Sequence, residues 1–464
     1  MSLAEVAKAA NTAQSGGVAQ FERAAQCEPT AQCEPTAQFG HTASSMIAGL
    51  VPETEPGRAV CAVVDELSEF MTRQAGPNDL AGQFARASVE RLRQTGVLAA
   101  CAPVADGGFG LESLYDLGLV VARLAEADAS VAVAATMHFQ LTSYFARSVR
   151  KAAAHERDGM AMRDWVRTLG RRDMVVCSAV AEPGLQPWQV GSTVRKSGDG
   201  WRADGRKVMA SISPAATHFY GRFKAETAHG PRMASVMIPA DLPGVTVQET
   251  WNGLGLRGSG SGTVLFEEVH LPQEAVALRG PWGVQLNAYD GRAAQAIPTV
   301  SVYLGIAEAA RRHGLESLSS GDGRQRRKSL GVCALVAEME LKIAGARAAL
   351  HTALRTLDAA ITDTAPRTRP ADEGRRLLKE CVVGGLIVER AAFEIVDLAM
   401  QLCGGRSFVH GHPLGRLYRD VRAAAFMRPW VPSEESLDFL AEVTFEELAE
   451  AAAAERAAAE GEQS

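Results

Sequence analysis

The hydrophobic pattern of this chain changes its period twice, and these changes limit the possible folds more than any single motif does. Up to about residue 172 the apolar residues recur at helical spacing, as in VVDELSEFMTRQ and LAGQFARASVERLRQTGVL. From Met174 the chain breaks into six short β-type runs separated by turns of Gly, Pro and Asp. Helical spacing returns after Gly283 in three or four long segments. This order predicts an α+β chain with an N-terminal helical domain, a middle antiparallel β-barrel or sandwich, and a C-terminal four-helix bundle.

The predicted parts follow from where the pattern changes. The helical domain is expected at residues 46–173, the β-domain at 174–284 and the bundle at 285–440, with bundle helices at 288–318, 330–362, 374–404 and 414–427. Residues 1–45 are expected to form a flexible tail, because they offer little to bury and two prolines interrupt the near-tandem AQCEPTAQCEPTAQ. Residues 441–464 are expected to form an acidic, alanine-rich tail with a fraying helix.

Charge and composition exclude several classes of function. The net charge of -6 provides no basic face for nucleic acid. No run of about 20 apolar residues appears, so no membrane span is predicted, and no secretory signal is recognised at the N-terminus. The eight cysteines form no CxxC pair, which disfavours a metal site or a disulfide scaffold and favours a reducing cytoplasm.

A double glycine near the C-terminus is the most informative local motif. A predicted helix reaches Gln401 and stops at Gly404-Gly405, and the segment PLGRLYRDVRAA, rich in cations, follows from Pro413. Glycine amides beside a helix terminus can meet oxyanions, so the corner suits a cofactor that carries phosphate. A plain helix C-cap is the alternative for the Gly-Gly pair alone.

The whole pattern, Gln401-x-x-Gly404-Gly405 and then Pro-x-x-Arg-x-Tyr-Arg-Asp ending at Asp420, resembles the C-terminal signature of the acyl-CoA dehydrogenase superfamily. In that family the Gln-x-x-Gly-Gly turn contacts the ADP part of a FAD held by the neighbouring subunit. The resemblance therefore implies Gln401, Gly404 and Gly405 as cofactor-binding residues and a homotetramer or homodimer. It covers about residues 55–430, with four motifs in the family's order.

Two motifs in the β-domain resemble the family's flavin-contacting turns. Ala181-Glu182-Pro183-Gly184 is similar to Thr-Glu-Pro-x-x-Gly-Ser, with Ala181 in place of the hydroxyl residue. The run from Gly205 to Ser211 is similar to Gly-x-Lys-x-Trp-x-Thr/Ser, with Met209 in place of the tryptophan that shields the flavin. The resemblance places Ser211 near the reactive N5 atom. An ordinary β-turn and a surface strand serine are the alternatives.

The family's catalytic glutamate has no counterpart at either usual position. An acyl-CoA dehydrogenase needs a carboxylate to remove the α-proton, but the two positions hold Arg428 and Gln295. A guanidinium stays protonated, so Arg428 is expected to hold an anionic substrate group rather than to act as a base. Asp290 and Glu182 are weak candidates for a relocated base.

The missing base shifts the expectation toward a second branch of the same fold. Flavin-dependent monooxygenases, among them aromatic two-component hydroxylases, dibenzothiophene monooxygenase and amino-sugar N-oxygenases, use reduced flavin and O2 and need no α-proton base. His138, in a mostly apolar helix, is a candidate proton donor in such a reaction, and a hydrogen-bonded core histidine is the alternative. The family's Arg-x-x-Phe-Gly, which helps to hold FAD across subunits, is replaced by SSGDGRQRRKSLGV. The C-terminal motif still makes FAD the expected cofactor, and FMN is the alternative.

The sequence therefore predicts a flavin-dependent monooxygenase that acts on a small or carrier-linked substrate, with a separate flavin reductase or electron acceptor as partner. An α,β-dehydrogenase of an acyl thioester is the second hypothesis. A catalytically silent family member that binds an acyl chain or a partner is the third.

Overall fold

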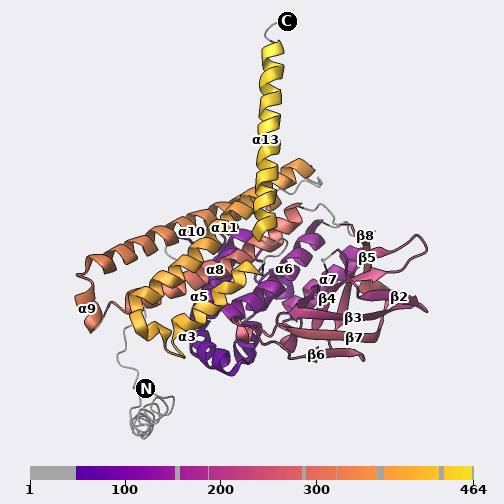
Figure 1. Cartoon of the computed structure of the whole chain (residues 1–464). Coiled ribbons are helices and arrows are strands. Elements are labelled where there is room, and N and C mark those ends of the chain that lie inside the picture. The colour runs from indigo at the N-terminus through magenta and orange to yellow at the C-terminus, as the bar shows by residue number, and fades with distance from the viewer. Residues whose placement is uncertain are drawn as a thin grey trace, which may run out of the picture. The chain divides into compact units, whose positions relative to one another are not determined.

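The structure, a computed structural model, describes residues 49–151, 157–185, 188–284, 289–319, 321–362, 370–427 and 433–461 (Figure 1). The predicted N-terminal tail and its repeat lie outside these residues. Within them the predicted order of helices, a sheet and then helices is confirmed.

The first part of the fold is helical. Its helices are α3 (Glu55–Ala81), α4 (Arg86–Gln94), α5 (Leu114–Ala127), α6 (Ala129–Lys151) and α7 (Arg157–Gly170). Asp128 caps the N-terminus of α6, because its Oδ1 accepts a hydrogen bond of 2.9 Å from the amide of Ser130. Thr54 caps α3 in the same way by accepting from the amide of Gly57.

The middle part is one eight-stranded sheet in the order β6-β7-β3-β2-β4-β5-β8, with β1 paired to β4. Its strands are β1 (Val176–Ala179), β2 (Thr193–Ser197), β3 (Gly200–Ala210), β4 (His218–Ala225), β5 (Arg232–Pro239), β6 (Val245–Gln248), β7 (Gly262–Leu271) and β8 (Val276–Pro281). Most of the strand pairings are antiparallel, as predicted, and two are parallel. β4 runs parallel to both β1 and β2, because the chain crosses over between them instead of turning back in a hairpin.

The last part is a helix bundle, joined by a long C-terminal helix. Its helices are α8 (Tyr289–Glu316), α9 (Asp322–Arg326), α10 (Leu330–Thr362), α11 (Ala371–Cys403), α12 (Pro413–Val421) and α13 (Ser433–Gly461). α13 runs unbroken across the boundary predicted at residue 440, and its acidic side chains pair with the start of α11, as in Lys379–Glu447 at 2.5 Å. None of the described helices has the length and apolarity needed to cross a bilayer.

Two glycines let α5 lie directly against the bundle. A Cβ on Gly305 of α8 would stand 2.2 Å from the carbonyl oxygen of Ala122, and one on Gly118 of α5 would stand 2.7 Å from Leu354. Both helices are buried along this contact, so neither can move aside without opening the core. The first helical part and the bundle therefore share one continuous hydrophobic core.

Replacing Gly305 by Ala is expected to lower the free energy of unfolding by about 1–3 kcal/mol, because the methyl group would collide with backbone rather than with a movable side chain. Gly345→Ala in α10 is the matched control, since nothing lies within 4 Å of its added Cβ, and it should stabilise the chain by up to about 1 kcal/mol. Thermal unfolding followed by circular dichroism measures both. Equal melting temperatures for the two variants would contradict the close approach.

Candidate functional site

The two segments predicted to contact a flavin lie side by side. The amide of Val208 in β3 donates a 3.0 Å hydrogen bond to the carbonyl of Ala181. Next to it, Nζ of Lys207 lies 2.5 Å from Oε1 of Glu182. Residues 25 positions apart in the sequence are thus in direct contact. This is the neighbourhood that the resemblance implied for Ala181, Glu182, Met209 and Ser211.

Glu182 is a structural carboxylate in this arrangement. Burial opposes its charge, but hydrogen bonds from Lys207 and from the amides of Ser192 and Gly191 outweigh burial and lower the pKa of the carboxyl group. A carboxylate that is held charged and fully hydrogen-bonded is a poor proton acceptor. The geometry therefore disfavours Glu182 as a relocated catalytic base.

Lys207 is the buried partner that the sequence motif did not assign. Its side chain is 0 % exposed, and burial lowers the pKa of its ammonium to about 8 despite the opposing effect of Glu182. Nζ also donates to the carbonyl of Arg222 at 2.6 Å and lies 4.7 Å from the ring centre of Phe223. Each partner of this ion pair is thus stabilised by further polar contacts, as a buried pair requires.

Met209 stands in an unusual conformation at the end of β3. Its φ is 52°, in the left-handed region that a non-glycine residue rarely adopts, and 68% of the residue is exposed. The β3–β7 register shifts between Lys207 and Ala210, so Met209 lies in an irregularity of the ladder. A bulge that turns an apolar side chain outward beside Ser211 fits the predicted position against a planar ring.

Ser211 lies two residues after Met209 and is almost buried, at 7% exposed. Its hydroxyl contacts the hydroxyl of Ser261 at 2.8 Å, and Ile212 after it again has a left-handed φ of 66°. Its carbonyl accepts from the thiol of Cys177 on β1. Backbone and side chain are both fixed, so Ser211 is held in place rather than free on a strand surface.

His138 is enclosed by backbone groups. Its Nδ1 accepts from the amide of Val176 at 3.0 Å, and its Nε2 lies 2.8 Å from the carbonyl of Leu98, so Nε2 carries the proton. The side chain is 0% exposed, and burial lowers the pKa of the ring to about 4. Both nitrogens are occupied, and this geometry favours the core histidine over the proton donor.

Replacing His138 by Ala is expected to destabilise the fold by about 2–5 kcal/mol, because two buried backbone groups lose their partners. The neutral ring of the folded state contributes stability above pH 6.5 that is lost as the pH falls toward 4, by roughly 2 kcal/mol at pH 5. Thermal melts between pH 5 and 7.5 should show that slope in the wild type and a smaller one in the variant. His410→Ala, on an exposed loop, is the control and should match the wild type.

The Gly-Gly corner forms a second, separate region. α11 ends at Cys403, and Gly404 adopts φ 67° and ψ -156°. A Cβ on either Gly404 or Gly405 would meet no atom within 4 Å, and Gln401 is exposed. The corner is therefore open to an incoming group, which fits the predicted cofactor contact.

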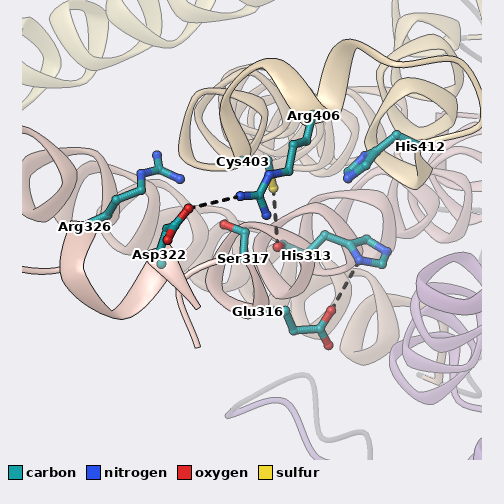
Figure 2. A pocket seen from close by; sticks show the side chains of 9 residues that line it. His313, Glu316, Ser317, Asp322, Arg326, Cys403, Arg406 and His412 are labelled. Carbon is teal, nitrogen blue, oxygen red and sulfur yellow. Dashed lines mark hydrogen bonds and ion pairs between the residues drawn. The ribbon is translucent and has the colours of Figure 1, made fainter. Parts of the chain in front are cut away.

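A pocket of about 260 Å³ opens beside this corner, between α8, α9 and the end of α11 (Figure 2). Arg406 pairs loosely with Asp322 at 3.9 Å, and His313 lies 3.4 Å from Glu316. His412 accepts from the amide of Leu414, which leaves its other ring nitrogen for a ligand. Two arginines and two histidines line the pocket with two carboxylates; its residues are His313, Glu316, Ser317, Asp322, Gly323, Arg326, Cys403, Arg406 and His412. The positive and negative side chains of the pocket nearly balance one another, and this mixture suits a polar or phosphorylated group.

The Tyr-Arg-Asp motif has a structural role that its sequence did not reveal. Arg419 binds both carboxylate oxygens of Asp79 in α3, at 2.8 and 2.5 Å. Asp420 accepts from the amide of Leu256 in the sheet domain, and burial raises the pKa of its carboxyl group to about 6. Adjacent residues of α12 therefore tie the bundle to the other two parts of the fold. Asp79 lies too far away in sequence for any local pattern to have indicated it.

Replacing Arg419 by Lys is expected to lower the free energy of unfolding by about 1–3 kcal/mol, because a lysine cannot reproduce the two-pronged contact with the buried Asp79. Arg406→Lys is the control, since its pair with Asp322 is exposed and contributes little. Chemical denaturation of both variants measures the difference, and equal midpoints would contradict the assigned role of Arg419.

Two of the predicted side chains are not among those that the structure describes. Arg428 lies outside the described residues, and the side chain of Asp290 is not described either. Gln295 is in α8, where its carbonyl accepts from Nε2 of Gln140 at 2.7 Å. Among the described residues no group of three or more His, Cys, Asp or Glu could hold a metal ion.

Comparison with known proteins identifies the family. Residues 60–151 match the acyl-CoA dehydrogenase N-terminal domain, and residues 291–428 match the acyl-CoA dehydrogenase C-terminal domain. The chain is 33% identical to the amino sugar nitrososynthase DnmZ of Streptomyces peucetius, over 84% of this chain and 94% of that protein. The chain belongs to the acyl-CoA dehydrogenase superfamily.

Other members of the superfamily agree with this assignment. The L-evernosamine nitrososynthase of a Micromonospora species is 33% identical over 82% of this chain and 88% of its own length. The structure of KijD3 in complex with FMN and an amino-sugar nucleotide has a TM-score of 0.78 at 30% identity, covering 85% of this chain and 95% of that one. Membership confirms the predicted acyl-CoA dehydrogenase fold and the predicted class, a flavin-dependent oxidoreductase.

Proposed function

We propose that the chain is a flavin-dependent monooxygenase that uses reduced FMN and O2 to oxidise the amino group of a nucleotide-linked amino sugar. The observation that carries the proposal is identity of 30–33% over more than four fifths of the chain to nitrososynthases and to KijD3, whose structure holds FMN and a dTDP-linked 3-amino sugar. Members at 25–27% identity are instead acyl-CoA dehydrogenases or putative ones.

The residues present fit a flavin. A bound flavin supplies the electrons that activate O2, and the chain's part is to position the ring and the substrate. The backbone around Ala181, the outward Met209 and the fixed hydroxyl of Ser211 form a surface with one apolar and one polar contact. Lys207 and Glu182 hold the two segments of this surface together.

The side chains at the positions that the resemblance implies for the base support oxygenation over dehydrogenation. The resemblance implies Gln295 and Arg428 at these positions, and Glu182 is held in a charged, hydrogen-bonded state. An oxygenation at nitrogen needs no proton abstraction from carbon. Arg428, and cations near the substrate phosphates, remain proposed anion contacts.

Three further features belong to the proposal. A separate flavin reductase would supply reduced flavin, and FAD is the alternative cofactor. A homotetramer or homodimer is proposed from family membership, with Gln401, Gly404 and Gly405 at a cofactor's phosphate end. A reducing cytoplasm is the proposed location, which agrees with the free state of the six described cysteines.

The test supplies the purified protein with FMN, a flavin reductase, NADH and O2, together with a dTDP-linked 3-amino sugar. Mass spectrometry should detect oxygen on the amine, and the analogue with a 3-hydroxyl group in place of the amine should stay unchanged. Anaerobic bleaching of the bound flavin by an acyl-CoA, with the amino sugar left intact, would favour the dehydrogenase instead. Neither reaction would favour a silent family member.

A further inference from the structure

Three serine hydroxyls form a chain from the interior to the edge of the candidate flavin site. Ser259 Oγ lies 2.7 Å from Ser261 Oγ, which lies 2.8 Å from Ser211 Oγ. Ser259 is 0% exposed, and the other two are each 7% exposed. We name these three residues the serine chain. None of the motifs in the sequence indicated that the hydroxyl of Ser211 is connected to two others.

The backbone holds the serine chain rigidly. The amide of Ile212 donates to the carbonyl of Ser259 at 3.0 Å, which joins the end of β3 to the short helix η4 (Arg257–Ser259). The amide of Ser259 in turn donates to the carbonyl of Leu256 at 3.1 Å. Because both strand ends are fixed, the oxygen-to-oxygen distances do not depend on side-chain freedom alone.

The direction of the hydrogen bonds follows from burial. The hydroxyl of Ser259 contacts only Ser261 among the polar atoms of the described residues, so its hydrogen is satisfied only if Ser259 donates to Ser261. The opposite direction leaves a buried O–H without an acceptor, at a cost of about 1–3 kcal/mol. Ser261 then donates to Ser211, and Ser211 is left as an acceptor on its inner side.

We propose that the serine chain orients the hydroxyl of Ser211 as a hydrogen-bond donor toward the bound flavin, with Ser261 and Ser259 as positioning residues. Because the hydroxyl oxygen of Ser211 accepts from Ser261, its own O–H can donate to an acceptor in the site. N5 of an oxidised flavin is such an acceptor, whereas N5 of a reduced flavin carries a hydrogen. The serine chain therefore favours the oxidised over the reduced ring, and this inference rests on the proposed flavin site.

Hydroxyls in series also strengthen one another. Each donor that is itself accepting is more polarised, by roughly 10–30% per bond. Removing the middle hydroxyl should therefore weaken the outer bond even though Ser211 is untouched. A purely structural serine would have no such effect on the flavin.

The test measures the affinity of the purified protein for oxidised FMN by fluorescence quenching and for reduced FMN by anaerobic titration. Ser261→Ala is expected to lower the preference for oxidised over reduced FMN by roughly threefold to tenfold, and Ser259→Ala by less. Ser261→Thr keeps a hydroxyl and should restore the preference. Ser213→Ala is the matched control, because its hydroxyl donates to the carbonyl of Gly260 in the same turn without joining the serine chain.

A double-mutant cycle separates orientation from general damage. In a Ser211→Ala background, Ser261→Ala should have no further effect on the preference, because its influence passes through the missing hydroxyl. If the wild type binds FMN but Ser261→Ala and Ser213→Ala show the same preference for oxidised over reduced FMN, the inference is overturned and the proposed function is left intact. An effect of Ser261→Ala that persists in the double variant would also overturn it. A wild type that binds neither form of the flavin would overturn both.

Discussion

Two adjacent side chains of α12 hold the three parts of the fold in register. Arg419 forms a bidentate ion pair with Asp79 near the end of α3, and Asp420 accepts a hydrogen bond from the amide of Leu256 in the sheet domain. Asp79 and Asp420 are buried, whereas the side chain of Arg419 is 29% exposed, so loss of either contact leaves a buried carboxyl group without that partner. The candidate site depends on the contact between Asp420 and Leu256, because the turn that begins at Leu256 also carries Ser259 and Ser261.

The two segments of the candidate flavin site are joined by a second ion pair, between Lys207 and Glu182. In the two motifs that resemble the family's flavin-contacting turns, the Lys and Glu are present, whereas Ala181 and Met209 stand in place of the hydroxyl residue and the tryptophan. The ion pair and the hydrogen bond from Val208 to Ala181 fix the backbone of both segments, so the outward side chains can differ while the two segments stay together. Altered chemistry on a retained frame agrees with the proposed shift from dehydrogenation to oxygenation.

Periodicity was enough to predict most of the fold. The helices α8, α10 and α11 begin and end within three residues of the expected positions, whereas α12 ends at Val421, before the expected residue 427. The parallel pairings of β4 could not be predicted, because a strand's own pattern does not name its neighbours. The same holds for the site. Ser211 and Glu182 were found through local motifs, whereas Ser261, Asp79 and the backbone partners of His138 lie tens to hundreds of positions from the residues they contact.

The left-handed backbone at Met209 has a consequence for how the site could have arisen. A glycine there would adopt the same conformation without strain, so a side chain at this position costs about 1 kcal/mol or more of folding free energy. The thioether cannot recover that cost by burial, because most of it faces outward. A bound flavin ring that covered the exposed thioether of Met209 would bury it, and this burial would offset part of the conformational cost. Binding of the flavin would then also stabilise the fold.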